Sequence, residues 1–544
     1  MKRKHSIKTM MMGGMVCLSL ASCASNYMDV SSTEDVDESS IFATTDGEMM
    51  AINGIHRLMH ESTASWYAQG GYQTFMLSTD LMAEDMVFTK SNPCLTWDAQ
   101  LTMHQTPSNR DNEYYYSFFY RIISNANKVI SCGDDIEGEA STHKYARGQA
   151  LAYRAFSYFN LVQMYGKRYE SGADNSQLGV ILRLDNSSNN LPRSTVEEVY
   201  RQINADLDEA ITLLEACGVE RQNKSHIDKS VAMGLKARVL LTQGKWEEAA
   251  SMAQKCIDAS GATLDDATYT TTDYRMSSAQ NSEWIWAKIS QSDQEGKLKQ
   301  YHAFNSNSNA SYNRNTPRCI YNKLYDKISA TDTRKGIWFP DAQDKSVTPA
   351  PIYPTNGNLY NYMSNKFLLP VGCDQNTAGD IPYMRLPEMI LIKAEALARE
   401  GKSTEAANAL YPLAYSRDKA YVLSTKQGED LIEEIMVQRR VELWAEGFRW
   451  FDLKRLNLPL DRGPAPRTEL GYSADGWKSG KKPSKVDPEA SNYNMYDTKA
   501  IGEENRYRKA GTNFWQWLFP ESETNINPLC EQNPIYTTTE ETSK

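Results

Sequence analysis

The chain has 544 residues, of which 40% are hydrophobic and 24% charged, and its formal net charge is -10 at pH 7. That length can bury a sizeable core, and length alone suggests roughly three or four domains. An acidic chain lacks the basic field with which proteins bind nucleic acid, so we exclude nucleic acid as a partner. The composition instead suits a protein that handles uncharged or mixed ligands.

The N-terminus combines a basic start with a short apolar run. Basic residues occupy positions 2–4, and the apolar run from Met10 to Leu20 is too short to cross a bilayer. The run ends in Leu20-Ala21-Ser22-Cys23, which is typical of the lipobox at which a lipoprotein is cleaved and its new N-terminal cysteine is acylated. We therefore expect residues 1–22 to be a signal peptide and residues 23–40 to be a tether that the lipid on Cys23 holds at a membrane. The alternative is an ordinary secretory signal with an incidental cysteine.

The other cysteines and the histidines give no sign of a metal centre. Of nine cysteines, Cys17 leaves with the signal and Cys23 would be acylated, so seven remain, an odd number without any CxxC pair. His56 and His60 stand four residues apart, a spacing that can hold a metal, but Arg57 occupies the place of the glutamate in the HExxH motif. A pair of histidines on a helix surface is therefore favoured, and we predict no bound metal.

The sequence contains no recognisable catalytic motif. There is no nucleophile elbow and no phosphate loop. Carboxylates such as Glu84 and Asp85 could serve a glycosidase, but acids are common in a chain that has 69 of them, and a sequence does not reveal the separation that makes a pair catalytic. We predict that the protein is not an enzyme and needs no cofactor.

One segment of the sequence occurs twice. Residues 236–253 read KARVLLTQGKWEEAASMA, and residues 393–410 read KAEALAREGKSTEAANAL. In each copy a first helix ends at a glycine, Gly244 or Gly401, and a second helix carries small residues on one face, which permits close helix packing. This is the turn and second helix of a tetratricopeptide-type repeat.

Two weaker helical patterns extend this set. Apolar stripes at helical spacing run through Tyr145–Tyr165 and Thr195–Leu214. We therefore predict helical repeats around residues 144–257 and 385–455. The fold class that follows is mainly α, built on tetratricopeptide-type hairpins with long loops and a few short strands.

Outside the repeats the sequence becomes irregular. Residues 260–380 hold short apolar pieces such as Trp284-Ile285-Trp286 within Asn-, Ser- and Thr-rich sequence, which predicts loops and short strands. Trp284 and Trp286 fall on the same side of a strand, and we interpret the pair as core or interface rather than as a stacking platform. Residues 457–513 combine Gly, Pro and Lys without periodicity and are interpreted as an irregular insertion. Because function usually sits on loops carried by a rigid part, we expect ligand-binding loops around residues 60–110 and 260–380.

Several separated segments form an ordered set along the chain. They include Asn53-Gly54-Ile55, Phe119-Tyr120-Arg121-Ile122-Ile123, Arg385-Leu386-Pro387-Glu388 and Phe519-Pro520-Glu521. The sharpest segment is residues 439–455, RRVELWAEGFRWFDLKR. Together with the lipobox, this set resembles the SusD/RagB family of outer-membrane nutrient-binding lipoproteins over nearly the whole mature chain.

Residues 439–455 match the family's structural signature. Its matching positions in this chain are Arg439, Glu442, Glu446, Gly447, Arg449 and Asp452. Glu446, Arg449, Asp452 and Arg455 follow one another at steps of three, so on a helix they can form ion pairs along one face.

The resemblance implies what the protein does and where it works. It implies a single SusD-like domain over residues 41–544, lipid-anchored at the outer membrane and facing the cell exterior. It also implies that the protein captures oligosaccharides and delivers them to a SusC-like TonB-dependent transporter, without catalysis. Two alternatives remain: a RagB-like protein that presents peptides, and a helical-repeat scaffold that docks other proteins.

Aromatic side chains in polar surroundings are the candidate ligand contacts. Sugar recognition uses rings that stack on a pyranose, with polar side chains that bond to its hydroxyl groups. Trp97 lies in a loop-like stretch where, by the resemblance, relatives contribute stacking residues. The full set of candidates is Trp66, Trp97, Tyr301, Tyr312, Asn313, Arg314 and Trp338. For each of them, the alternative is a partly buried surface residue without a ligand.

Overall fold

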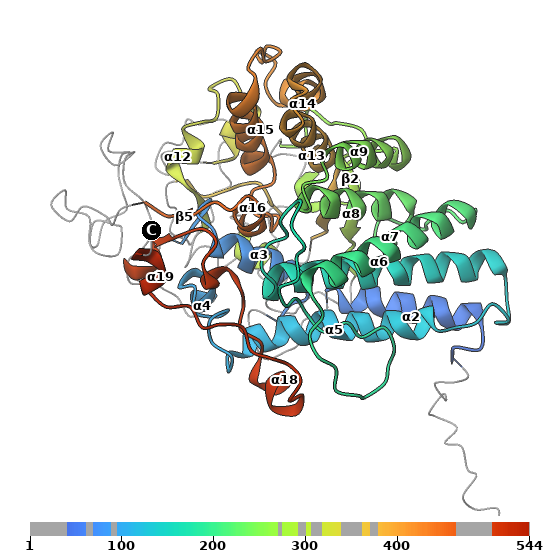
Figure 1. The fold of residues 1–544 in the computed structure, drawn as a ribbon. Coiled ribbons are helices and arrows are strands. Elements are labelled where there is room, and N and C mark those ends of the chain that lie inside the picture. Colours follow the sequence, from blue (N-terminus) through green and yellow to red (C-terminus); the bar gives the residue numbers. More distant parts are fainter. Residues whose placement is uncertain are drawn as a thin grey trace, which may run out of the picture.

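Helices that pack one against the next make up most of the protein (Figure 1). The computed structural model describes residues 41–60, 69–88, 95–269, 275–291, 301–305, 318–338, 362–369, 379–463 and 503–542. The strands in these ranges are short, and the predicted mainly α class is confirmed. None of the helices described is long and apolar enough to cross a membrane.

The longer helices form a stack that follows chain order. They are α2 (Thr45–Leu58), α5 (Arg110–Ile130), α6 (Ala140–Tyr165), α7 (Val196–Ala216), α8 (Lys229–Thr242), α9 (Trp246–Ser260), α13 (Leu386–Arg399), α14 (Ser403–Arg417) and α15 (Gly428–Glu442). Both α2 and α5 pack on α6, and the contacts continue through α7, α8 and α9 to α13, which packs on α14 and α15. Figure 1 shows this stack rising from α5 to α14. The contact between α9 and α13 brings together the two predicted groups of repeats.

The two copies of the repeat form the same turn. Gly244 and Gly401 follow α8 and α13 with φ of +70° and +81°, a conformation that glycine adopts without strain. In each copy the N–H of the lysine after the glycine donates to the carbonyl oxygen of the leucine five residues earlier, at 3.0 Å in the first and 2.9 Å in the second. These bonds define a Schellman turn, so the predicted helix ends are confirmed. The residues predicted on the packing face of the second helices are fully buried, namely Ala249, Ala253, Ala406 and Leu410.

Short strands pair beside the helices. Within the described residues the antiparallel pairs are β1 (Met86–Phe88) with β3 (Arg318–Ile320), β2 (Trp284–Lys288) with β4 (Ile381–Arg385), and β5 (Leu460–Asp461) with β6 (Tyr507–Arg508). Trp284 and Trp286 are both buried, so of the two predicted roles, core and interface, the structure supports the core. The register of β2 shifts on both sides of Trp286, and the two rings pack into separate clusters, so they do not form one continuous surface.

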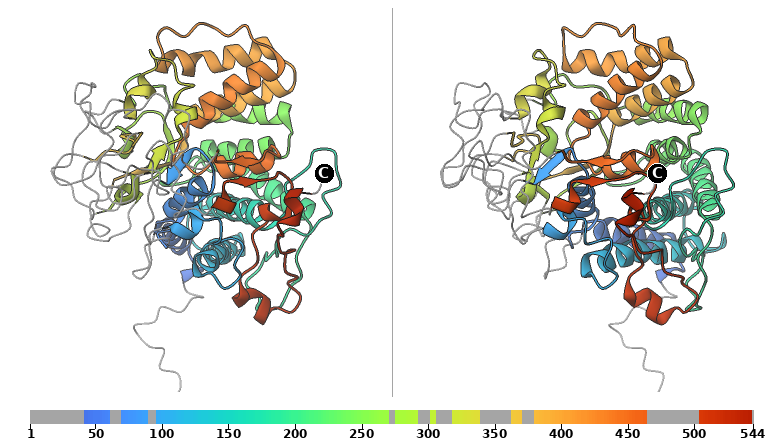
Figure 2. Two further views of the ribbon diagram at one scale, coloured as in Figure 1. Left: turned by 90° about the vertical axis from the view of Figure 1, so that its left-hand side faces the viewer. Right: turned by 60° about the vertical axis from the view of Figure 1, so that its left-hand side comes forward.

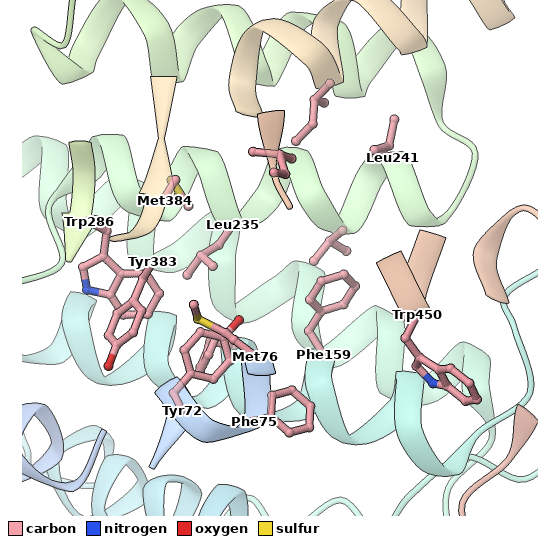
Figure 3. Close-up of a cluster of buried hydrophobic side chains, with 14 of the residues drawn as sticks. Tyr72, Phe75, Met76, Phe159, Leu235, Leu241, Trp286, Tyr383, Met384 and Trp450 are labelled. Atoms are coloured by element: carbon pink, nitrogen blue, oxygen red, sulfur yellow. The ribbon is translucent and has the colours of Figure 1, made fainter. Parts of the chain in front are cut away.

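Helix α3 (Tyr72–Met82) lies in the interior. All of its residues are buried, as expected of a helix that is surrounded by other elements. Figure 3 shows Tyr72, Phe75 and Met76 of this helix in one cluster with side chains from the helical stack and from β2 and β4. The remaining short helices are α4 (Thr96–Ala99), α10 (Tyr301–Asn305), α12 (Asn322–Tyr325), α16 (Arg449–Arg455), α18 (Glu521–Ile526) and α19 (Thr539–Thr542).

The C-terminal segment packs against the first helices of the stack. The backbone N–H of Trp517 donates to the Met164 carbonyl oxygen at 2.9 Å, and the Asn112 side-chain amide donates to the Leu518 carbonyl oxygen at 2.8 Å. Figure 2 shows this red segment beside the cyan helices. This segment therefore helps to fix α5 and α6 in place.

The signature does not form one continuous helix. α15 ends at Glu442, and α16 begins only at Arg449. Between them Ala445 and Gly447 have φ of +66° and +84°, so the chain turns sharply. A Cβ on Gly447 would lie 2.8 Å from the Cα of Met76, which shows how closely the turn approaches α3. The segment is therefore not one helix, because this approach requires a bend at the glycine.

The bend also changes the ion pairs that a continuous helix would form. Of the expected pairs, Asp452 with Arg455 is present at 2.8 Å. The Nε of Arg449 instead donates to Glu84 at 2.8 Å, and Glu446 faces the interior. The expected pairs Glu446–Arg449 and Arg449–Asp452 are therefore replaced by contacts with other parts of the chain.

A buried ionic network lies beneath the bend. The carboxylate of Glu442 accepts hydrogen bonds at 3.0–3.1 Å from three buried arginines, Arg334, Arg385 and Arg417. Glu446 bonds to Lys366 and Arg385, both at 2.6 Å. The partners belong to the irregular region before α13 and to the end of α14, so the signature fixes that region to the helical stack.

Candidate functional site

A cavity of about 470 Å³ opens beside the C-terminal end of α2. It lies between α2, α6, the loop that precedes α8, β2 and β4. Its exposed polar rim consists of Asn53, Arg57, Asn223 and Gln291. Its buried wall includes His56, Tyr153, His226, Trp286, Lys288 and Tyr383. The volume falls within the range of small-molecule sites, about 300–1,000 Å³.

Three aromatic rings make one wall of the cavity rigid. Trp286 packs edge-on against Tyr383 and Tyr153, with ring centroids 5.2 and 6.1 Å apart. The indole N–H of Trp286 donates to the Ser225 carbonyl oxygen at 3.1 Å, and the Tyr383 hydroxyl donates to the Met59 carbonyl oxygen at 3.4 Å. Because each ring is at most 5% exposed, this wall offers shape and polarity rather than an open stacking platform.

Two buried histidines face each other in the wall. The rings of His56 and His226 lie 4.5 Å apart between centroids. Burial lowers the pKa of His56 well below its ordinary value, and the neighbouring His226 lowers it further. Burial and the charge of Arg221 also lower the pKa of His226. Both imidazoles are therefore neutral at pH 7, and each presents one N–H donor.

The histidines differ from their sequence interpretation. His56 is only 9% exposed, so the description of His56 and His60 as a pair on a helix surface is wrong for His56. The ring is buried because it packs against Tyr153 of α6 and against His226 in the loop before α8. In the part of the chain that the structure describes, no group of three or more His, Cys, Asp or Glu is arranged to hold a metal ion.

Lys288 brings a buried cation to the cavity. Lys288 is 2% exposed, and its Nζ donates to the Ser290 hydroxyl at 3.2 Å. Burial lowers the pKa of Lys288 to about 8, although the charge of Asp380 acts in the opposite direction. The amino group is therefore still largely protonated at pH 7, although burial makes its charged form less favourable.

Among the predicted ligand contacts that the structure describes, Trp97 is the exposed residue. It lies on α4, is 39% exposed, and has the guanidinium carbon of Arg110 5.4 Å from its ring centroid. It is not among the residues that line the cavity. The next residue, Asp98, is fully buried, and burial together with Asp111 raises its pKa to about 7. Trp97 stays a candidate for stacking on a sugar, separate from the cavity.

Tyr301 and Trp338 are buried rather than exposed. The Tyr301 hydroxyl donates to the Ala445 carbonyl oxygen in the signature bend. The Trp338 ring packs edge-on against Trp444, with centroids 5.8 Å apart. Both residues are 0% exposed, so neither ring has a face free for a sugar. We correct their interpretation as ligand contacts, because the polar sequence around them concealed their contacts with this bend.

Other sequence candidates lie outside the described residues or have a structural role. Cys23, Trp66, Tyr312, Asn313 and Arg314 fall outside the described residues. Glu84 and Asp85, which were weighed as a glycosidase pair, instead form ion pairs with arginines of the signature, Arg449 at 2.8 Å and Arg440 at 2.9 Å.

Sequence reasoning missed the cavity because five separate parts of the chain build it. The prediction placed the ligand on loops, whereas β2, β4 and two helices contribute most of the wall. One signal was present in the sequence. Asn53, Arg57 and His60 follow at steps of four and three, which brings three polar side chains to one face at the end of α2.

Matches to family models cover both halves of the chain. Residues 26–241 match a model described as starch-binding and associating with the outer membrane, and residues 258–536 match the model of the SusD family.

The chain belongs to the SusD family. The predicted family is thereby confirmed. SusD-family proteins are carbohydrate-binding proteins without enzymatic activity, which confirms the prediction that the chain is not an enzyme. The family associates with the outer membrane.

Relatives of this SusD-family chain include proteins that bind carbohydrate. SusD-like protein P2 of Formosa agariphila is 25% identical over 468 residues, covering 77% of this chain and 85% of that protein. A SusD-like carbohydrate binding protein from Bacteroides vulgatus has 23% identity and a TM-score of 0.74, covering 91% of this chain and 99% of that one. The surface glycan-binding protein A from Bacteroides thetaiotaomicron, solved with laminarihexaose, has 16% identity and a TM-score of 0.63, covering 90% and 99%. These structures share the fold of this chain.

Proposed function

We propose that the protein captures oligosaccharides at the outer membrane and delivers them to a SusC-like TonB-dependent transporter. An acyl group on Cys23 anchors it, and the folded part faces the cell exterior. The observation that carries the proposal is the family match along both halves of the chain, to models of starch-binding and SusD proteins. The solved relative with laminarihexaose supports an oligosaccharide as the ligand.

Two features of the structure support this function. The cavity combines a rigid aromatic wall with polar side chains on its rim, the kind of surface that fixes the orientation of a small polar ligand. Trp97 adds an exposed ring of the type that stacks on the apolar face of a pyranose. Neither feature needs a metal or a catalytic group.

Binding to a panel of oligosaccharides tests the proposal. We expect the mature protein to bind at least one oligosaccharide class in isothermal calorimetry, and Trp97→Ala to weaken that binding about tenfold. Tyr415→Ala is the matched control, because Tyr415 is also 39% exposed but lies on α14. Unchanged affinity in Trp97→Ala would remove this residue from the site. Binding to peptides alone, without any glycan, would contradict the oligosaccharide proposal and favour the peptide alternative.

Fractionation of cells tests the anchor and the partner. We expect the wild-type protein in the outer-membrane fraction, accessible to protease added to intact cells, and recovered together with a TonB-dependent transporter. In cells that lack the transporter, Cys23→Ser should release the protein from the outer membrane, because the lipid would then be its only attachment. Retention of Cys23→Ser in the outer membrane of these cells would contradict acylation at this residue.

A further inference from the structure

A second cavity, of about 460 Å³, lies at the other end of the helical stack. It opens between residues 327–334, the loop that joins α14 to α15, and α15 itself. Figure 1 shows α15 near the top of the molecule and α2 in its lower half. The volume again falls within the range of small-molecule sites, about 300–1,000 Å³. The two cavities share no lining residue, so they are separate sites.

The charged side chains of the second cavity pair with one another. Three ion pairs join them, namely Arg334–Asp332 and Lys327–Glu433 at 2.6 Å and Lys426–Glu434 at 3.3 Å. In total five carboxylates and three cations line the cavity, so two negative charges remain in excess. A lining of this composition repels an acidic ligand. Neutral hydroxyl groups suit it better, because each can donate to a carboxylate oxygen and accept from an N–H group.

Gln438 and Asp430 bring a donor and an acceptor to this cavity. The carbonyl oxygen of the Gln438 side chain accepts a hydrogen bond from the buried Arg334 guanidinium at 2.5 Å, which fixes the orientation of the amide. In the part of the chain that the structure describes, the amide nitrogen has no hydrogen-bond partner. Asp430, in the first turn of α15, lines the same cavity, and within these described residues its carboxylate has no partner either. The two side chains can therefore bond to a ligand without losing a bond within the protein.

Tyr421 adds an aromatic ring that its surroundings hold in place. Its hydroxyl donates to one oxygen of the Glu434 carboxylate at 2.6 Å, and the Ser424 hydroxyl donates to the other oxygen at 2.8 Å. The ring is partly exposed and lines the cavity together with two valines of α15, Val437 and Val441. A fixed ring beside apolar and hydrogen-bonding groups is the combination that binds a pyranose.

We propose that this second cavity binds a neutral saccharide unit, as a glycan site separate from the cavity beside α2. Tyr421 stacks on the apolar face of the sugar, Gln438 donates to a hydroxyl oxygen, and Asp430 accepts a hydrogen bond from a hydroxyl group. The inference rests on the proposed function and adds a second site to it. It also states the class of sugar that this site takes, because the excess negative charge excludes uronates and sulfated sugars.

Isothermal calorimetry with defined hexasaccharides tests the inference. The neutral probes are maltohexaose, laminarihexaose, cellohexaose and xylohexaose, and the acidic probe is an oligogalacturonate of the same length. We expect the mature protein to show two binding events with at least one neutral hexasaccharide, because the two sites are separate.

Two variants assign one of these events to the second cavity. Tyr421→Ala removes the ring, whereas Gln438→Glu keeps an oxygen for Arg334 and replaces the donor nitrogen with a second acceptor. Each variant should weaken one binding event about tenfold and leave the other unchanged. Tyr415→Ala and Gln177→Glu are the matched controls, because they make the same changes at positions that line neither cavity.

Folding of the variants is checked by circular dichroism. Gln438→Glu replaces a single heavy atom and preserves the bond to Arg334, so it keeps the test decisive if Tyr421→Ala fails to fold. Binding of the oligogalacturonate should be the same in wild type and in both variants, because the lining excludes it from this cavity.

The outcomes separate this inference from the proposed function. Neutral hexasaccharides that bind equally well to wild type and to both variants overturn the inference but leave the proposed function intact. An oligogalacturonate whose binding both variants weaken also overturns it, because the site then takes acidic sugars. No binding to any glycan overturns both.

Discussion

At the scale of single residues, buried charges rather than exposed aromatics distinguish this protein. Burial alone would raise the pKa of Glu442, but the charges of Arg417, Arg385 and Arg334 outweigh it and hold the pKa well below its ordinary value. The sequence indicated that Glu442 and its neighbours matter, through the family signature. It did not reveal the partners, because these are brought together only by the fold.

Removing the central carboxylate of this network should destabilise the protein strongly. We expect Glu442→Gln to lower the free energy of unfolding by about 3–5 kcal/mol, because it leaves three buried arginines short of a counter-ion. Glu433→Gln is the control, since Glu433 pairs with Lys327 at the surface and should cost no more than about 1 kcal/mol. Urea denaturation measures both. Equal losses in the two variants would show that the buried network contributes nothing beyond a surface ion pair.

Asp98 should make stability depend on pH in the direction opposite to an ion-paired acid. Its pKa is raised to about 7, so the folded protein holds this proton more tightly than the unfolded chain. Its contribution is present at low pH and is lost as the pH rises from about 4 to 7. Asp98→Asn removes this dependence, so the variant should gain stability relative to wild type between pH 5 and pH 8.

The exposed Asp185 provides the control for this prediction. Asp185 is not buried, and hydrogen bonds from Ser187 lower its pKa instead. Asp185→Asn should therefore show no gain over wild type as the pH rises. Thermal unfolding at the two pH values measures the difference, and a parallel response of the two variants would refute a buried, protonated Asp98.

At the scale of elements, the sequence predicted helices and turns correctly where interactions between neighbouring residues determine them. The hairpin turns at Gly244 and Gly401 followed from a repeated pattern, and both form with the same hydrogen bonds. The signature segment has equally good helical spacing, yet it bends at Gly447 because α3 lies against it. That approach depends on a helix over 360 residues away in sequence, as the Gly447–Asp80 hydrogen bond illustrates, so periodicity could not reveal it.

Two glycines should respond to alanine in opposite directions. Gly401 has φ of +81° and no atom near its missing Cβ, so Gly401→Ala isolates the backbone cost, about 1–2 kcal/mol of stability. Gly54 lies within α2 and also has open space around a Cβ, so Gly54→Ala should stabilise by about 0.5–1 kcal/mol. Chemical denaturation of both variants checks the signs. A stabilised Gly401→Ala would contradict the left-handed turn.

At the scale of the whole molecule, the sequence revealed the scaffold and the family but not the cavity. Each repeat and each signature segment is contiguous in sequence, so it can be recognised from the sequence alone. The cavity joins α2, α6, the loop before α8, β2 and β4, and its lining comes together only when these elements are packed. For the same reason the overall acidic composition, which suggested uncharged or mixed ligands, says little about this local surface.

A crystal structure of the mature protein with its best-binding oligosaccharide shows where the ligand lies. We predict a sugar unit bound in the cavity beside α2 or stacked on Trp97, the two features that support the proposed function. An oligosaccharide that contacts neither this cavity nor Trp97 would contradict this prediction.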